Sequence, residues 1–306
     1  MLSPETANEI DLDVRFVTSF DVASLALLVF DYFLTLDLEV ALIWPSGWSL
    51  VKVIFLINRY MPFIDVPLAL YHQLYRPQSE SSCRSLYIST AWMFILGIGL
   101  TEFVLVYRTW ALYDNSKPLG VALLIYFLAF WIAICYGLSR FLDSLRFLID
   151  PNFPLPGCII IDASDHLAFD WILLMVFESG ILLLMLNKAY RMYLTSRSTT
   201  IFRTVYRDGI MYYVYIYILS LVNLIYIRTQ SRALVVVLAS LQRVVHSVLT
   251  TRLILGLRQE IVDYQRSPRQ TPPFSLDDGA ILMQELPRSR NNPNIPPPSR
   301  VSAVES

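Results

Sequence analysis

Residues 31–71 read DYFLTLDLEVALIWPSGWSLVKVIFLINRYMPFIDVPLALY and combine apolar length with charged side chains. From residue 48 to residue 71 the chain is long enough to cross a hydrocarbon layer of roughly 30 Å, which needs about 20 mainly apolar residues. Lys52, Arg59 and Asp65 interrupt this run, but the apolar residues between them leave no polar face wide enough for water. The stretch therefore predicts a membrane-spanning helix whose charges face protein.

Arg59 is the charge that most needs a partner. A guanidinium at the bilayer centre costs between about 2.5 and 17 kcal/mol, so it requires an anion. If the first span ends near Asp37, Asp31 lies at nearly the same depth as Arg59, and we predict that these two residues pair. Pro62 frees the carbonyl of Asn58, four residues earlier, and predicts a kinked helix with unsatisfied backbone beside the arginine.

Several short motifs of this stretch belong together as a signature. They are DYFLTLDLEV at 31–40, IWP at 43–45, Trp48, Lys52 and FLINRY at 55–60. This signature resembles the N-terminal region of a fungal family of multi-pass membrane proteins, the domain of unknown function 6533. The resemblance is close in the N-terminal part of the chain and extends to the rest only in the layout of hydropathy. It implies a membrane protein from a fungus, and it implies no activity, cofactor or ligand.

The composition of the whole chain also indicates a membrane protein. Of its 306 residues, 55% are hydrophobic and 16% are charged, whereas soluble domains average about 45–50% and about 25%. Several apolar runs exceed the length of about 10–14 residues that is typical of a buried helix in a soluble core. The net charge of −1 gives no general attraction to nucleic acid, so we expect no nucleic-acid partner.

We predict an all-α fold, a polytopic membrane bundle of seven transmembrane helices with the lipid bilayer as its surroundings. The predicted spans are residues 17–37, 50–71, 86–107, 119–139, 167–187, 209–227 and 233–251. The predicted organisation is an outer segment at 1–16, a seven-helix domain at 17–260 with the signature at 31–71, and a disordered proline-rich tail at 264–306.

The distribution of Lys and Arg predicts the orientation of the bundle. More of these residues fall on the side of the C-terminus, chiefly in the connector 188–208, which predicts an outside N-terminus and a cytoplasmic C-terminus. The same connector and the tail are the candidate surface for a cytoplasmic partner. We expect the protein in the plasma membrane or the secretory pathway.

Two cysteines fall on the predicted outer side. Cys83 precedes the third span and Cys158 lies in the long connector 140–166. Thiols oxidise on the secretory route, so we predict a disulfide that fastens this connector over the bundle. It would resemble the disulfide between the third helix and the second outer loop of seven-helix receptors. The alternative is two unpaired surface cysteines.

Four charged residues are predicted near the middle of the bilayer: Asp31, Arg59, Glu178 and Arg243. Two acids and two bases give a balanced set, as a hydrocarbon interior requires. A charge network of this kind serves an ion or proton path, or a switch in which pairs break and re-form. The same residues also fit fixed pairs that only decide which helices are neighbours.

Motifs for metals, cofactors and enzymes are missing from the sequence. His72 and His166 are predicted at the outer surface and His246 in the inner half of the last span, so the three histidines predict no metal site. The last span holds no lysine for a retinal chromophore, and no glycine-rich phosphate loop, serine-hydrolase motif or CxxC motif occurs. We therefore predict no cofactor and find no motif that indicates an enzyme.

Two functional classes remain. The first is a receptor-like sensor of a small molecule or lipid, which the cysteine pair and the basic inner connector favour. The second is a transporter or proton-coupled carrier that uses the charge network, although seven helices without a visible repeat between halves disfavour the usual carrier architecture. A cavity open only toward the outside favours sensing, and a passage through the mid-depth charges to both surfaces favours transport.

Overall fold

The computed structural model describes residues 4–74, 79–147, 158, 160–162, 164, 166–194, 200–229 and 238–266. The elements are α1 (Pro4–Leu42), α2 (Leu50–Tyr60), α3 (Pro62–Leu74), α4 (Glu80–Leu112), α5 (Lys117–Ser144), β1 (Arg146–Phe147), β2 (Ile160–Asp162), α6 (His166–Leu194), α7 (Thr200–Thr229) and α8 (Ala239–Arg266). The predicted all-α class is confirmed. The tail from residue 267, the middle of the long connector at 148–157 and residues 230–237 lie outside the described part of the chain.

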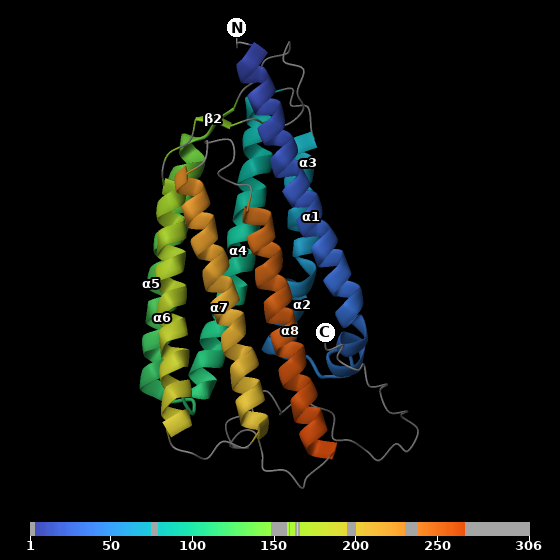
Figure 1. Cartoon of the computed structure of the whole chain (residues 1–306), viewed down its shortest axis with the longest axis vertical. Coiled ribbons are helices and arrows are strands. Elements are labelled where there is room, and N and C mark those ends of the chain that lie inside the picture. The colour runs from blue at the N-terminus through green and yellow to red at the C-terminus, as the bar shows by residue number, and fades with distance from the viewer. Residues whose placement is uncertain are drawn as a thin grey trace.

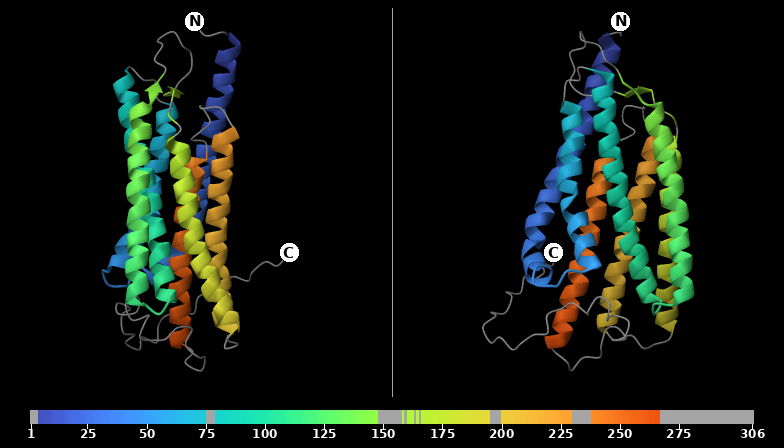
Figure 2. Two further views of the ribbon diagram at one scale, coloured as in Figure 1. Left: turned by 90° about the vertical axis from the view of Figure 1, so that its left-hand side faces the viewer. Right: turned by 180° about the vertical axis from the view of Figure 1, so that it is seen from behind.

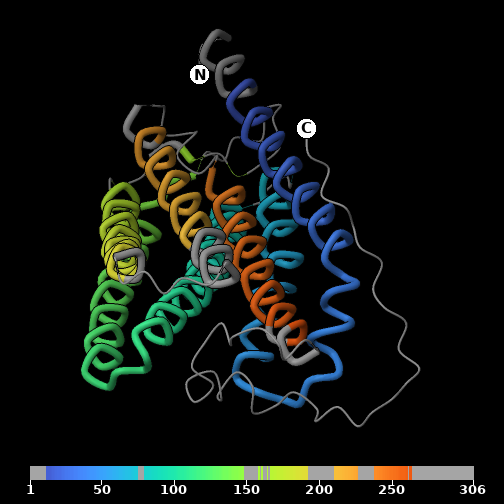
Figure 3. Tube along the Cα trace, turned by 60° about the horizontal axis from the view of Figure 1, so that its bottom comes forward, coloured from blue at the N-terminus to red at the C-terminus, as the bar shows by residue number. Residues whose placement is uncertain are grey.

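The helices stand side by side along the long axis of the molecule (Figure 1; Figure 2). α8 lies inside the bundle, where it contacts α1, α2, α3, α4 and α7. Figure 3 shows α8 between α1 and α7, with α4 behind it. The largest cluster of buried apolar side chains joins α2 and α4 to α8, with Phe55, Leu105 and Leu255 among its members.

The predicted break at Pro62 is present. α2 ends at Tyr60 and α3 begins at Pro62, with Met61 between them in a helical conformation. The amide of Met61 still donates to the carbonyl of Ile57 at 2.9 Å, so the two helices form one interrupted rod. Proline causes the interruption because it has no amide hydrogen to donate and its ring crowds the preceding turn.

Hydropathy identifies only part of the predicted bundle as membrane-spanning. Four segments are long and apolar enough to cross a membrane: Leu50–Leu74, which joins α2 and α3, Glu80–Leu112, Lys117–Ser144 and His166–Arg191. The segment Ile210–Tyr226 of α7 is apolar but shorter. Among the described residues, α1 and α8 do not reach this threshold. Several apolar helices indicate an integral membrane protein. Hydropathy does not confirm the predicted seven spans, because it identifies four candidate spans and one shorter apolar segment among the described residues.

The polarity of α1 is inverted relative to a helix on a soluble protein. Its outward side chains include Phe30 and Phe33, which are 65% and 68% exposed. Its buried face includes two apolar residues, Val17 and Leu28, but most of it is polar: Asp21, Ser24, Asp31, Thr35 and Glu39. A water-soluble helix buries its apolar stripe instead, so this pattern fits lipid outside and protein inside.

α8 carries the same kind of buried polarity. Its buried polar side chains are Ser240, Gln242, Arg243, His246, Ser247, Thr250, Thr251 and Arg258. These residues lower the hydropathy of α8, although they face neighbouring helices and not solvent. The low hydropathy of α8 therefore has a structural cause, which is its set of polar contacts inside the bundle.

A small cap closes one end of the bundle. Strands β1 and β2 pair antiparallel, and Cys158 just before β2 forms a disulfide with Cys83 on α4. The Cα atoms of the two cysteines lie 5.5 Å apart. Strands, disulfide and the N-terminal end of α1 lie at the same end (Figure 1), which we call the disulfide end.

Two helices extend beyond the limits of the predicted spans. The polar N-terminal segment is not separate from the first helix, because α1 begins at Pro4. The last helix runs to Arg266, well beyond the predicted end of the seventh span at residue 251 and into the predicted tail. Arg252 and Arg258 suggested an inner boundary, yet both bond to the N-terminal part of the chain from within the helix.

Candidate functional site

Arg59 does not pair with Asp31, so that prediction is wrong. Its Nε forms a buried ion pair with Glu39 of α1, and its two other nitrogens donate to Thr35 Oγ1 at 2.9 Å and to the carbonyl of Tyr32 at 3.2 Å. The cause is the length of the first helix. Because α1 continues to Leu42, Glu39 is still helical and reaches the depth of Arg59.

The four predicted charges are each paired, but none of them pairs with another of the four among the described residues. Asp31 accepts from Arg252 of α8 at 2.6 Å. Arg243 contacts Asp65 of α3 at 2.9 Å, with both side chains fully buried. The predicted single network is thus replaced by separate pairs, and most of them join α8 to another helix.

The backbone freed by Pro62 also finds a partner on α8. The hydroxyl of Ser247 donates to the carbonyl of Asn58 at 2.6 Å. The side-chain amide of Asn58 donates through Nδ2 to the carbonyl of Ser247 at 3.3 Å. Its Oδ1 accepts from the hydroxyl of Thr101 of α4 at 2.9 Å. An unsatisfied carbonyl in the membrane interior costs several kcal/mol, and this exchange removes that cost.

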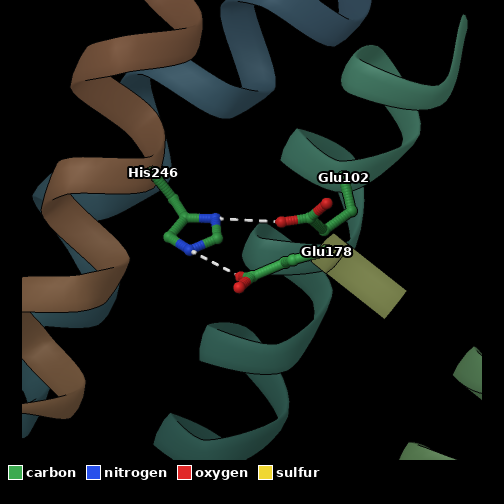
Figure 4. A group of neighbouring side chains, drawn as sticks. All are labelled: Glu102, Glu178 and His246. Atoms are coloured by element: carbon green, nitrogen blue, oxygen red, sulfur yellow. Dashed lines mark ion pairs between the residues drawn. The ribbon is translucent and has the colours of Figure 1, made fainter. Parts of the chain in front are cut away.

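The fourth predicted residue, Glu178, belongs to a buried cluster with Glu102 and His246 (Figure 4). The three side chains come from α6, α4 and α8 and point toward one another. His246 Nδ1 lies 3.5 Å from Glu102 Oε1, and His246 Nε2 lies 3.8 Å from Glu178 Oε1. Within the described residues, His246 is the only ion-pair partner of either glutamate.

A chain of hydrogen bonds holds Glu178 in position. Asn223 of α7 donates to Gln242 Oε1, Gln242 Nε2 donates to Ser220 Oγ at 2.8 Å, and Ser220 Oγ donates to Glu178 Oε1 at 2.7 Å. All of these groups are buried. This series of hydrogen bonds leaves Glu178 Oε2 without a hydrogen-bond partner among the described residues. Glu102 Oε1 and His246 Nδ1 also lack a hydrogen-bond partner there.

The cluster was not predicted from the sequence. The sequence places His72 and His166 on other segments than His246, so the histidines alone indicate no metal site. The missed partners were Glu102 and Glu178, two acids in apolar helices that the sequence does not connect. A buried acid in each of two apolar helices was the available signal, but only the packing of α4, α6 and α8 shows that they meet.

A cavity of about 190 Å³ opens within the disulfide end of the bundle. Its lining is mostly apolar and aromatic and comes from α1, α3, α4, α5, α6 and α8, together with Cys158 and Ile160 of the cap. For scale, an apolar cavity of roughly 150 Å³ accommodates benzene. The predicted disulfide partner Cys158 thus forms part of the wall of a cavity large enough for a small apolar group.

Few polar groups line this cavity. Gln73 of α3 donates to Asp21 of α1 at 2.5 Å, which ties two of the lining helices together. Asp170 of α6 is also buried and lies against Gly137, and both of its carboxylate oxygens are without a hydrogen-bond partner among the described residues. The cavity therefore combines a mostly apolar wall with the carboxyl group of Asp170, which has no hydrogen-bond partner on either oxygen among the described residues.

An apolar layer separates the cavity from the buried cluster. Ile98 and Leu174 line the cavity and belong to a buried group that includes Trp131. Glu102 and Glu178 each lie four residues further along the same helices, a step of about 6 Å at the helical rise. Neither glutamate lines the cavity.

Comparison with known proteins gives one finding, which concerns the N-terminal region. A search of curated proteins finds no match to the chain. Residues 19–64, which include Glu39, Arg59 and most of the signature described above, match the model of a family of unknown function, DUF6533.

Proposed function

We propose that the chain is a seven-span integral membrane protein with its N-terminus outside and its C-terminus in the cytoplasm, in the plasma membrane or the secretory pathway. The four long apolar segments and Ile210–Tyr226 account for five spans. The outward apolar face of α1 supports a sixth, and the central position of α8 supports a seventh. A fungal source remains the implication of the signature.

We further propose that this protein is a receptor-like sensor of a small amphipathic molecule. The observation that carries this proposal is the cavity at the disulfide end, whose walls come from six helices and the cap. A molecule bound there touches most of the bundle at once, so its binding energy can favour one helix arrangement over another. The disulfide supports this role because it fixes the cap at the edge of the cavity.

The chemistry of the lining indicates the class of ligand. Tyr87, Phe94 and Trp171 offer aromatic surface, and Asp170 offers a carboxyl group whose oxygens lack hydrogen-bond donors among the described residues. A protonated amine on an apolar skeleton satisfies both features, because the ammonium supplies the missing donors and the skeleton fills the apolar wall. We therefore propose apolar amines as the ligand class.

The alternative function, a transporter or proton-coupled carrier, needs a polar path from the cavity to the charges below it. Ile98, Trp131 and Leu174 form an apolar barrier at that point. The arrangement favours sensing over transport for this reason. The connector 188–208 and the tail, which lie partly or wholly outside the described residues, are the proposed surface for a cytoplasmic partner.

Thermal unfolding of the purified full-length protein in nanodiscs tests the ligand class. We expect apolar primary amines to raise the melting temperature and alcohols of the same skeleton to raise it less. A ligand at 100 times its Kd stabilises a protein by about 2.7 kcal/mol. Asp170→Asn should remove the preference for the amine while keeping the response to the apolar skeleton.

Two substitutions to phenylalanine provide the matched comparison. Ala91→Phe fills the cavity, whereas Ala129→Phe adds the same bulk on the exposed face of α5. Ala91→Phe should abolish ligand stabilisation and Ala129→Phe should not. Equal responses of both variants to the amines would contradict binding in this cavity.

A further inference from the structure

We propose that Glu102, Glu178 and His246 form a binding site for one divalent transition-metal ion of the Zn²⁺ or Mn²⁺ class. The site lies outside the cavity proposed for the amphipathic ligand. The proposal of a metal site does not depend on the sensor function. Three helices that are distant in sequence each contribute one ligand to it (Figure 4).

The distances within the cluster suit an ion better than direct hydrogen bonds. The two imidazole–carboxylate separations of 3.5 and 3.8 Å exceed the usual range for N–H···O bonds of about 2.7–3.2 Å. Two ligand atoms of one tetrahedral Zn²⁺ ion lie about 3.3–3.6 Å apart, given metal–ligand bonds of about 2.0–2.2 Å. The two measured separations are of this size but involve different ring nitrogens of His246, so the cluster has room for an ion without already having the arrangement of bound ligands.

One adjustment completes the coordination. An ion takes one ring nitrogen of His246, and the two nitrogens face different glutamates. One ligand atom from each residue nevertheless lies within 4.8 Å of the other two. Binding of one ion therefore requires one glutamate side chain to rotate toward the ring nitrogen that coordinates the ion.

Charge balance gives the strongest reason for a cation. Two carboxylates buried in the middle of a membrane bundle are costly unless cations face them. Arg243, one turn before His246, is engaged with Asp65, and neither glutamate pairs with a lysine or arginine among the described residues. A divalent ion neutralises both carboxylates and also gives partners to Glu102 Oε1 and Glu178 Oε2.

The surroundings resemble those of a metal ligand. Carboxylates that bind metals are usually held by a further hydrogen bond, and Ser220 supplies one to Glu178 Oε1. The donor set of two carboxylates and one imidazole suits Zn²⁺, Mn²⁺ and Fe²⁺ better than soft Cu⁺ or the purely oxygen-seeking Ca²⁺. Ser220 is thus a positioning residue for the site.

Metal titration of the full-length protein tests this proposal. The protein is purified, stripped with EDTA, and titrated separately with Zn²⁺, Mn²⁺ and Co²⁺. We expect one equivalent to bind with a rise in melting temperature, and Co²⁺ to give the visible absorption of a low-symmetry nitrogen–oxygen site. Glu102→Gln, Glu178→Gln and His246→Ala should each remove this absorption, and Ser220→Ala should weaken binding about 10- to 100-fold.

The controls are Glu80→Gln and His166→Ala, which remove an exposed acid and an exposed histidine. Both should bind metal as the wild type does. If a ligand variant fails to fold, the wild-type titration and Ser220→Ala decide the question. The proposal is overturned if the stripped wild type binds none of the three ions stoichiometrically, or if the folded ligand variants bind as the wild type does.

Discussion

At the scale of single residues, the structure replaces one predicted ion pair by another. Arg59 is clamped against α1 by Glu39, Thr35 and the carbonyl of Tyr32. Glu39 in turn accepts from Tyr60 at 2.9 Å and from Trp44 at 3.2 Å. Every hydrogen-bonding group around the arginine is thus drawn from α1, α2 or the turn between them.

Substitutions at Arg59 test this clamp. Arg59→Ala leaves Glu39 as a buried unpaired acid and should destabilise the protein by about 3–5 kcal/mol. Glu39→Gln combined with Arg59→Gln removes both charges and should recover much of the folded yield, measured by fluorescence-detected size-exclusion chromatography in detergent. Asp31→Asn combined with Arg59→Gln is the matched control and should not recover it. Equal recovery by both doubles would contradict the Glu39 pair.

The same residues show what the sequence can and cannot predict. It indicated correctly that Arg59 is buried in a helix broken at Pro62, because apolar length and proline chemistry act locally. It did not identify Glu39, because the partner depends on where α1 ends, and helix ends are poorly defined by hydropathy. The cluster of Glu102, Glu178 and His246 was out of reach, since it depends on the packing of three helices.

At the scale of elements, the fit of α4 against α8 depends on one glycine. Arg243 reaches Asp65 of α3 by passing directly over Gly97 of α4. A Cβ added at Gly97 would overlap the guanidinium of Arg243. Gly97 is therefore required by a close approach and not by backbone conformation.

Alanine substitutions at two glycines separate this effect from helix propensity. Gly97→Ala should destabilise the protein by about 1–3 kcal/mol, because overpacking displaces Arg243 from its partner. Gly256→Ala is the control, since a Cβ there meets nothing within 4 Å, and it should be neutral or stabilising by up to about 1 kcal/mol. Thermal unfolding in the same detergent compares them. A Gly97→Ala protein as stable as the wild type would refute the tight contact.

The cap is the second feature at this scale. The disulfide between Cys83 and Cys158 joins the start of α4 to the connector before α6, and the carbonyl of His72 accepts from the amide of Cys158 at 3.4 Å. Phe141, Leu145 and Phe147 pack in the same buried cluster as the two cysteines. The cap is thereby joined to α3, α4 and α5, the helices that form one side of the cavity.

At the scale of the whole molecule, many polar groups lie in the interior beside the apolar core, and the surface carries many large apolar side chains. The inward faces of α1 and α8 carry acids, bases, amides and hydroxyls, while outward residues such as Phe33, Ile132 and Leu183 are about two-thirds exposed. In water this distribution would favour aggregation. In lipid it is favourable, because most buried charged side chains meet a partner and the outward apolar side chains meet hydrocarbon.

Hydropathy alone underestimates the number of membrane-spanning helices in such a bundle. A helix whose polar residues face protein can have the same mean hydropathy as a helix that lies in water. α8 is a helix of this kind, and neither α8 nor α1 is among the four segments that meet the criterion for a membrane span. The central claim is that α1, α7 and α8 all cross the bilayer together with these four segments, so that the chain spans it seven times, an odd number. Four spans alone would place both termini on the same side.

The location of the two termini decides this claim most directly. Epitope tags at the N-terminus and the C-terminus of the full-length protein are tested for protease digestion in sealed microsomes, with and without detergent. We predict that the C-terminal tag is digested in sealed vesicles and that the N-terminal tag is protected until detergent is added. Digestion of both tags, or protection of both, in sealed vesicles would contradict the seven-span bundle.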